Sequence, residues 1–128
     1  RLTLRIQCPE QTMRFDRDRF EQVMHNLVNN AINHAYPESV IEISVILQDS
    51  ISRIEIKSAG DPIPAEALTK IWERYYRAGR VESGRPLGTG LGLAIVKSIF
   101  DQHQVHYGVS SQNDQTLFWF ETCSPADS

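Results

Sequence analysis

The stretch from Asp18 to Ala35 constrains the fold most, because it carries an unbroken helical stripe of apolar residues. Its apolar positions advance in alternating steps of three and one, at Phe20, Val23, Met24, Leu27, Val28, Ala31 and Ile32. That spacing predicts an amphipathic helix that buries one continuous face. Asp16 or Asp18 can cap its start, and Pro37 lies just past its end.

Alternation of apolar and polar residues predicts a sheet beside this helix. Residues 41–48 and 53–57 both alternate, and the short turn at Asp49 and Ser50 between them predicts an antiparallel hairpin. We expect further strands at residues 2–6, 105–111 and 116–121, a turn at 8–11, and a short strand at 13–15.

Two more helices and one long loop complete the chain. Residues 65–76 place Leu68, Ile71, Trp72 and Tyr75 at helical spacing, and residues 90–102 form the third predicted helix. Residues 77–89 are rich in glycine and arginine, which predicts a long mobile loop. The predicted fold class is α+β, a two-layer α/β sandwich. Its mixed, mostly antiparallel sheet has about five strands, with three helices on one face.

Composition limits the possible functions. The 128 residues allow one domain over 1–128, and 41% apolar with 23% charged residues excludes disorder as the main state. The formal net charge of −3 argues against a nucleic-acid partner. No apolar run is long enough to span a bilayer, and the first residues do not form a signal peptide. Cys8 and Cys123 stand far apart, which argues against zinc and favours two free thiols in a reducing cytoplasm over a single bridge.

The long predicted helix also carries a band of amide side chains. Gln22, Asn26, Asn29, Asn30 and Asn33 lie beside the apolar stripe. Asparagine is a mediocre helix former, so this band costs helix stability without a structural return. It is either a solvated face or a set of neutral oxygens for a hard cation. Mg²⁺ prefers oxygen ligands and is often completed by substrate phosphates.

A glycine-rich run opens the third predicted helix. Gly88, Gly90 and Gly92 alternate with Thr89, Leu91 and Leu93. Glycines let a backbone approach a ligand, and free N–H groups at a helix start attract phosphate. The alternative is a flexible connector that ends in a helix.

Two further features adjoin this run. Arg77, Arg80 and Arg85 precede the glycine-rich run, and the guanidinium group of arginine is suited to binding phosphate oxygens. The alternative is that these arginines only make the surface soluble. Residues 58–64 follow a predicted strand, where Ser58 and Gly60 either recognise the edge of a base or form an ordinary turn.

Taken in order, these segments resemble the ATP-binding catalytic domain of bacterial sensor histidine kinases. That domain belongs to a superfamily shared with type II topoisomerases, Hsp90 chaperones and MutL proteins. The family's N box is matched by residues 26–35 (NLVNNAINHA), its F box by 71–77 (IWERYYR), and its G2 box by 88–96 (GTGLGLAIV). The F box sets this branch apart from the other superfamily members.

The resemblance implies a role for each matched residue. It implies that Asn30 binds Mg²⁺ and that Asn26 lies near the phosphates. It also implies that Arg77 contacts the γ-phosphate and that Ile63 lines the adenine pocket. Asn26 and Arg77 are the implied catalytic residues, and residues 78–87 match a lid over the nucleotide. The whole implied nucleotide site comprises Asn26, Asn30, Asn33, His34, Ser58, Gly60, Ile63, Tyr76, Arg77, Arg80, Arg85, Gly88, Thr89, Gly90, Leu91, Gly92 and Leu93.

The sequence departs from the family pattern at the G1 box, normally DxGxG. Ser58 replaces the aspartate that accepts a hydrogen bond from the adenine amino group, and Pro62 replaces the second glycine. A hydroxyl still accepts such a bond but carries no charge, so we expect a loss of roughly 1–2 kcal/mol, about ten-fold in affinity. A small polar residue followed by Gly-x-Pro-Ile also occurs in the branch that includes metal-responsive sensor kinases.

Four other residues also depart from the pattern. Asn33 replaces a common lysine near the phosphates, His34 a common tyrosine, and Gln104-Val105 a Gly-Gly turn. Without the charge of that lysine, Arg80 and Arg85 would have to supply more of the positive charge near the phosphates.

The implied function is that of a protein-histidine kinase. The domain would bind ATP with Mg²⁺ and pass the γ-phosphate to a histidine on its own dimerisation domain, and from there to a response regulator. No segment with a phosphorylatable histidine precedes the N box, so we expect a fragment that is not competent alone for autophosphorylation. We expect the fragment to be monomeric and to come from the cytoplasmic part of a homodimeric inner-membrane sensor kinase. The main alternative is a degenerate interaction module that binds nucleotide weakly or not at all because of Ser58. A chaperone-like ATPase is a third.

Overall fold

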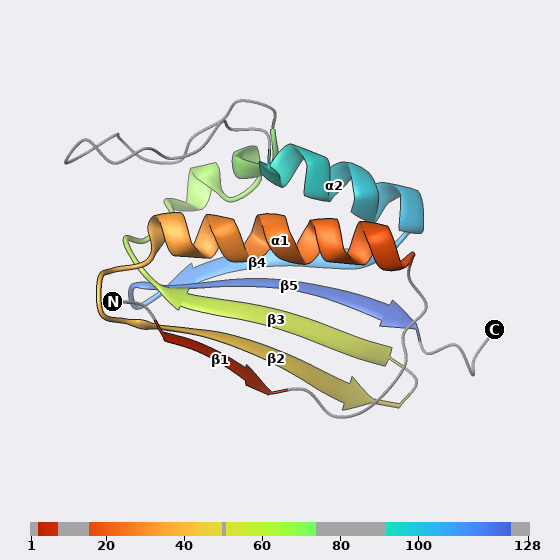
Figure 1. Ribbon diagram of the computed structural model, residues 1–128. Helices are drawn as coiled ribbons and strands as arrows, with labels where there is room; N and C mark the ends of the chain where they lie inside the picture. The colour runs from red at the N-terminus through yellow and green to blue at the C-terminus, as the bar shows by residue number, and fades with distance from the viewer. Residues whose placement is uncertain (1–2, 8–15, 50, 74–91, 124–128) are drawn as a thin grey trace.

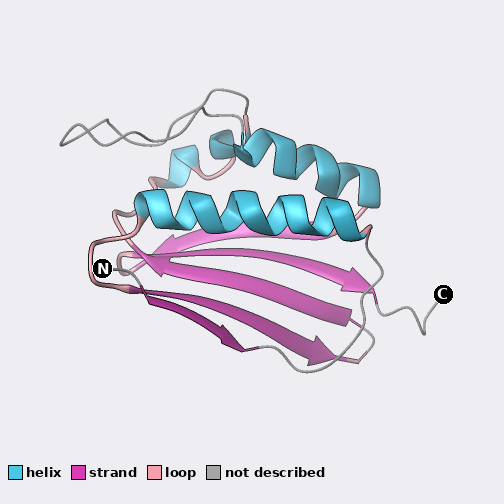
Figure 2. Cartoon of the chain, viewed as in Figure 1, coloured by secondary structure: helices cyan, strands magenta, loops and turns pink. Residues whose placement is uncertain are grey.

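The computed structural model describes residues 3–7, 16–49, 51–73 and 92–123. In this part a twisted β-sheet forms one layer and the helices form the other, all on the same face of the sheet (Figure 1 and Figure 2). The predicted α+β sandwich is confirmed.

The sheet has five strands. They are β1 (Thr3–Gln7), β2 (Val40–Gln48), β3 (Ile51–Ala59), β4 (His106–Gln112) and β5 (Gln115–Cys123). Their spatial order is β1-β2-β3-β5-β4, with β1 parallel to β2 and every other pair antiparallel. The hairpin predicted on the two sides of Asp49 is therefore confirmed. The turn and strand predicted within residues 8–15 lie outside the described residues.

The helix α1 (Arg17–His34) begins and ends as the sequence predicts. Asp16 caps it, with Oδ1 accepting a hydrogen bond from Arg19 N at 3.1 Å. Val23, Leu27 and Ala31 are buried along its apolar face. The predicted stripe is wrong at its last position, because Ile32 is 40% exposed.

The predicted helix over 65–76 is corrected by the structure over residues 65–73, whereas residues 74–76, with Tyr75, lie outside the described residues. Two 3₁₀ turns, η1 (Ala65–Ala67) and η2 (Lys70–Trp72), occupy its first part, and the chain becomes extended at Glu73. Pro64, at the start, offers no side-chain cap, and the turns close with i→i+3 bonds such as Ala67 N to Pro64 O at 2.8 Å. Ile71 and Trp72 still point into the core, as the spacing predicts.

The core lies between the sheet and the helices. The helix α2 (Gly92–His103) packs against α1 and buries Val96, Ile99 and Phe100. The ring centroid of Phe100 lies 4.8 Å from that of Phe120 on β5. Along β3 the buried positions alternate with exposed or half-buried ones, at Ser52, Ile54, Ile56 and Ser58. On β5 they are Thr116, Phe118, Phe120 and Thr122.

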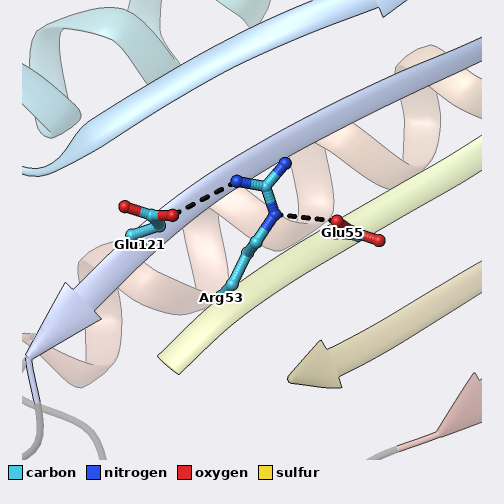
Figure 3. A network of polar contacts seen from close by, with 3 residues as sticks. All are labelled: Arg53, Glu55 and Glu121. Atoms are coloured by element: carbon cyan, nitrogen blue, oxygen red, sulfur yellow. Dashed lines mark hydrogen bonds and ion pairs between the residues drawn. The ribbon is translucent and has the colours of Figure 1, made fainter. Parts of the chain in front are cut away.

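The opposite face of the sheet carries no helix in the described part of the chain. There Arg53 joins Glu55 at 2.7 Å and Glu121 at 3.2 Å (Figure 3). Its guanidinium also stacks 4.3 Å from the ring centroid of Trp119. Partial burial lowers the pKa of Arg53, but the hydrogen bonds to Glu55 and Glu121 and the negative charges of these two carboxylates together raise it, so its net pKa shift is upward. This face is held together by charge and stacking, and the core by apolar packing.

Candidate nucleotide site

Three segments far apart in sequence lie at one end of the domain, on the left in Figure 1. They are the C-terminal half of α1, the end of β3 with the loop after it, and the turn between β4 and β5. The start of α2 lies further in, beside Asn26 in the middle of α1. The antiparallel pairing of β3 with β5 and of β4 with β5 brings the second and third segments together.

On α1 the amides of the band differ in exposure. Gln22, Asn26, Asn30 and Asn33 are half-buried. Asn29 is exposed, and its Nδ2 lies 2.9 Å from His25 Nε2. Asn29 therefore lies at the exposed edge of the predicted band, because a step of three from Asn26 turns it about 60° around the helix.

The start of α2 lies against the first of these amides. A Cβ placed on Gly92 would be 3.8 Å from Asn26 Oδ1, an ordinary contact distance. The first N–H groups of a helix have no partner within the helix, and they attract anions. An amide side chain and a helix start are thus side by side, which is an arrangement suited to phosphate oxygens.

At the end of β3, Ser58 points into the space between the layers. Its side chain is 6% exposed, and its partner across the strand pair is Thr116, which is 8% exposed. Thr116 in turn pairs with Ser111 on β4. Of these three hydroxyls only Ser58 is indicated by the sequence, because cross-strand register is not visible in one strand's residues. The signal for Thr116 was its alternation with Phe118 and Phe120, which marks it as inward-facing.

The loop after β3 is tied to α1 and to the β4–β5 turn through its backbone. Tyr36 N donates to Ala59 O at 2.8 Å, and Gly60 N donates to Asp114 O at 2.9 Å. Gly60 also forms a bridge with Ala35, and a Cβ on Gly60 would overlap the backbone oxygen of His34. Glycine is therefore required here for close approach of two backbones.

Two side-chain hydrogen bonds hold the same loop. Ile63 N donates to Ser111 Oγ at 2.9 Å, and the Ile63 side chain packs against the edge of the core. Tyr36 donates its hydroxyl to Asp61 at 3.0 Å. That bond, with smaller contributions from burial and from the charges of Asp114 and Asp61, raises the pKa of Tyr36.

Comparison with known proteins identifies the fold and its superfamily. Residues 15–125 match the family model described as histidine kinase-, DNA gyrase B- and HSP90-like ATPase. The chain belongs to this family. Within the family, similar proteins include sensor proteins and histidine kinases, which confirms the resemblance to the ATP-binding domain of sensor histidine kinases.

Three of these similar proteins illustrate the match. The sensor protein VanS of Enterococcus faecium is 35% identical over 117 residues, which cover 91% of this chain and 30% of that protein. The sensor protein CzcS of Cupriavidus metallidurans is 40% identical over 84 residues, or 66% of this chain and 18% of that protein. The nucleotide-free catalytic domain of histidine kinase ThkA superposes with a TM-score of 0.80 at 28% identity, over 96% of this chain and 79% of that one. The chain thus spans less than a third of either curated relative.

For this histidine kinase-like ATPase domain, part of the predicted site is described. The described predicted residues are Asn26, Asn30, Asn33, His34, Ser58, Gly60, Ile63, Gly92 and Leu93. His34 is exposed, and Leu93 is half-buried against the core. Tyr76, Arg77, Arg80, Arg85, Gly88, Thr89, Gly90 and Leu91 lie outside the described residues, as does the predicted lid at 78–87.

The donor set of the ATPase domain determines which metal would fit. Over the described residues, no group of three or more His, Cys, Asp or Glu is arranged to hold a metal ion. The half-buried amide oxygens of Asn26 and Asn30 are hard, neutral donors, and such donors fit Mg²⁺ when phosphate oxygens and water complete its shell. The helices within the described ranges include none long and apolar enough to cross a membrane.

Proposed function

We propose that the domain binds Mg²⁺-ATP at this end of the sheet and donates the γ-phosphate to a histidine on the dimerisation domain of its own sensor kinase. The observation that carries the proposal is the position of Asn26 beside Gly92 at the start of α2, with Asn30 half-buried one turn further along α1. Phosphoryl transfer needs positioning and charge neutralisation more than covalent help from the protein, and this arrangement offers the positioning.

Each group has a definite task in this proposal. Asn30 offers its amide oxygen to the metal, which supplies positive charge to the phosphates. Asn26 and the first N–H groups of α2 hold phosphate oxygens. Ser58 and Ile63 bind the base, and Arg77 reaches the γ-phosphate, as the family resemblance implies. A response regulator is then the final acceptor, and the domain belongs to the cytoplasmic part of a homodimeric inner-membrane sensor kinase.

Substitution of Asn30 tests the proposal, with Asn29 as the matched control. Both are asparagines of α1, but Asn30 is half-buried whereas Asn29 is exposed and its Nδ2 lies 2.9 Å from His25 Nε2. Asn30→Ala should weaken Mg²⁺-dependent binding of an ATP analogue by at least about ten-fold, because a metal ligand is lost. Asn29→Ala should leave the affinity unchanged. Metal-dependent binding that survives in Asn30→Ala, with unchanged circular dichroism, would refute the ligand role.

The second candidate is an interaction module that keeps the fold but binds nucleotide weakly. The observation in its favour is Ser58, an uncharged group at the buried end of β3 where the family pattern has a carboxylate. The two candidates separate in the same titration, because only the first gives metal-dependent binding.

A further inference from the structure

The base end of the candidate site is lined by three hydroxyls in one row across the sheet. Ser58 on β3 pairs with Thr116 on β5, and Thr116 pairs with Ser111 on β4. Residues directly opposite each other on one face of an antiparallel pair have Cβ atoms about 4.5–5.5 Å apart. The side chains of Ser58 and Thr116 are buried and that of Ser111 is half-buried, so the row faces the space under the helices.

No carboxylate joins this row in the part of the chain that the structure describes. The inward positions of β3 and β5 hold only apolar and hydroxyl side chains. The nearby acids are exposed: Asp61 accepts the hydroxyl of Tyr36, and Asp114 lies in the β4–β5 turn. Polar recognition at this point therefore depends on hydroxyls.

A hydroxyl differs from a carboxylate in the direction of its hydrogen bonds. An ionised carboxylate only accepts, whereas a serine or threonine hydroxyl rotates to donate or to accept. Ser111 shows one half of this behaviour, since it accepts from Ile63 N at 2.9 Å and keeps its own O–H for another partner.

We propose that the hydroxyl row Ser58–Thr116–Ser111 makes the base pocket tolerant of purines with either a 6-amino or a 6-oxo group. Adenine presents a donor at its 6-amino group and an acceptor at N1. Hypoxanthine presents the reverse, an acceptor at O6 and a donor at N1. A carboxylate at Ser58 would leave O6 facing an acceptor, a buried mismatch that costs binding, whereas the hydroxyls turn to suit both edges. The inference rests on the proposed function and specifies the nucleotide class for the same site.

Calorimetric titration of the domain with Mg²⁺ and either ADP or inosine diphosphate tests this inference. The two ligands differ only at position 6 and in the protonation of N1. We expect dissociation constants within about five-fold of each other, because each ligand finds the same number of neutral hydrogen bonds. Binding of ADP with inosine diphosphate weaker by about fifty-fold or more would overturn the inference and leave the proposed function intact. Binding of neither nucleotide would overturn both.

Variants show whether Ser58 carries the tolerance. Ser58→Asp should raise the preference for ADP by about ten-fold or more, because the carboxylate repels O6. An unchanged preference in folded Ser58→Asp would contradict the inference. Ser58→Ala is the milder variant and should weaken both ligands by a similar factor; a loss confined to ADP would count against a rotating hydroxyl. The matched control is Ser52→Ala, because Ser52 is also buried on β3 and paired to a threonine, Thr122, but at the opposite end of the strand.

Discussion

Gly60→Ala should destabilise the domain, because the added Cβ has no room. In the structure that atom would overlap the backbone oxygen of His34 and lie 3.6 Å from Ala35 Cα. The obstruction is backbone at the end of α1, which cannot move aside as a flexible side chain would. The loop and the helix end must separate, which strains the hydrogen bonds from Tyr36 N to Ala59 O and from Gly60 N to Asp114 O.

The magnitude follows from these contacts. Overpacking a tight site costs about 1–3 kcal/mol, and each weakened hydrogen bond adds up to about 1 kcal/mol. The smaller entropy of an unfolded chain with alanine offsets about 0.4–1 kcal/mol. We expect a net loss of about 1–3 kcal/mol. With an unfolding entropy of about 2.1 cal/mol/K per residue over 128 residues, this lowers Tm by about 4–11 °C.

Gly92→Ala is the control for this prediction. Among the described residues, the atoms nearest to its added Cβ belong to the Asn26 side chain, at 3.8 Å or more, so the stability of the variant should stay within about 1 kcal/mol of wild type. Urea unfolding followed by tryptophan fluorescence and by circular dichroism measures both variants, since the buried Trp72 reports on the core. Equal midpoints for Gly60→Ala and wild type would refute the steric argument.

Two further predictions concern the surface of the domain. Gly108→Ala places a Cβ 2.7 Å from the indole of Trp119 and should push that ring away from the sheet. We expect the free energy of unfolding to fall by about 1 kcal/mol and the tryptophan emission to shift to the red; unchanged emission and stability would contradict this. The hydrogen bond to Asp61 raises the pKa of Tyr36, so Asp61→Asn should lower that pKa toward its ordinary value. Phenolate absorbance measures the titration, and Tyr36→Phe identifies the part of the signal that comes from Tyr36. Because the pKa of Tyr36 is higher in the folded than in the unfolded protein, the bond stabilises the fold below pH about 10, and this stabilisation is lost as the pH rises through the folded pKa. Identical alkaline titrations of wild type and Asp61→Asn would count against the bond.

Much of the fold was predictable because its elements follow simple periods. The alternation on both sides of Asp49 predicts the β2–β3 hairpin, and the stripe through Val23 and Leu27 predicts α1. For the segment after Pro64, the helical spacing of Leu68, Ile71 and Trp72 predicts a helix, whereas the structure has two 3₁₀ turns. Over so few residues a 3₁₀ turn buries the same side chains, so periodicity does not separate the two.

The candidate site was predictable where its residues are neighbours in sequence. Asn26 and Asn30 are one turn apart on a helix, so their shared face follows from spacing alone. Its base end was harder, because Ser58, Thr116 and Ser111 meet only through strand register. The tight contact of Gly60 with His34 is also a product of tertiary packing, and no local pattern indicates it.

Calorimetric titration of the wild-type domain with a non-hydrolysable ATP analogue, with and without Mg²⁺, tests the proposed function most directly. We predict metal-dependent binding with a dissociation constant in the micromolar range, because Asn30 and the nucleotide phosphates would both coordinate the Mg²⁺ ion. An absence of binding up to millimolar nucleotide, in domain that is folded by circular dichroism, would contradict the account and leave the interaction module as its replacement.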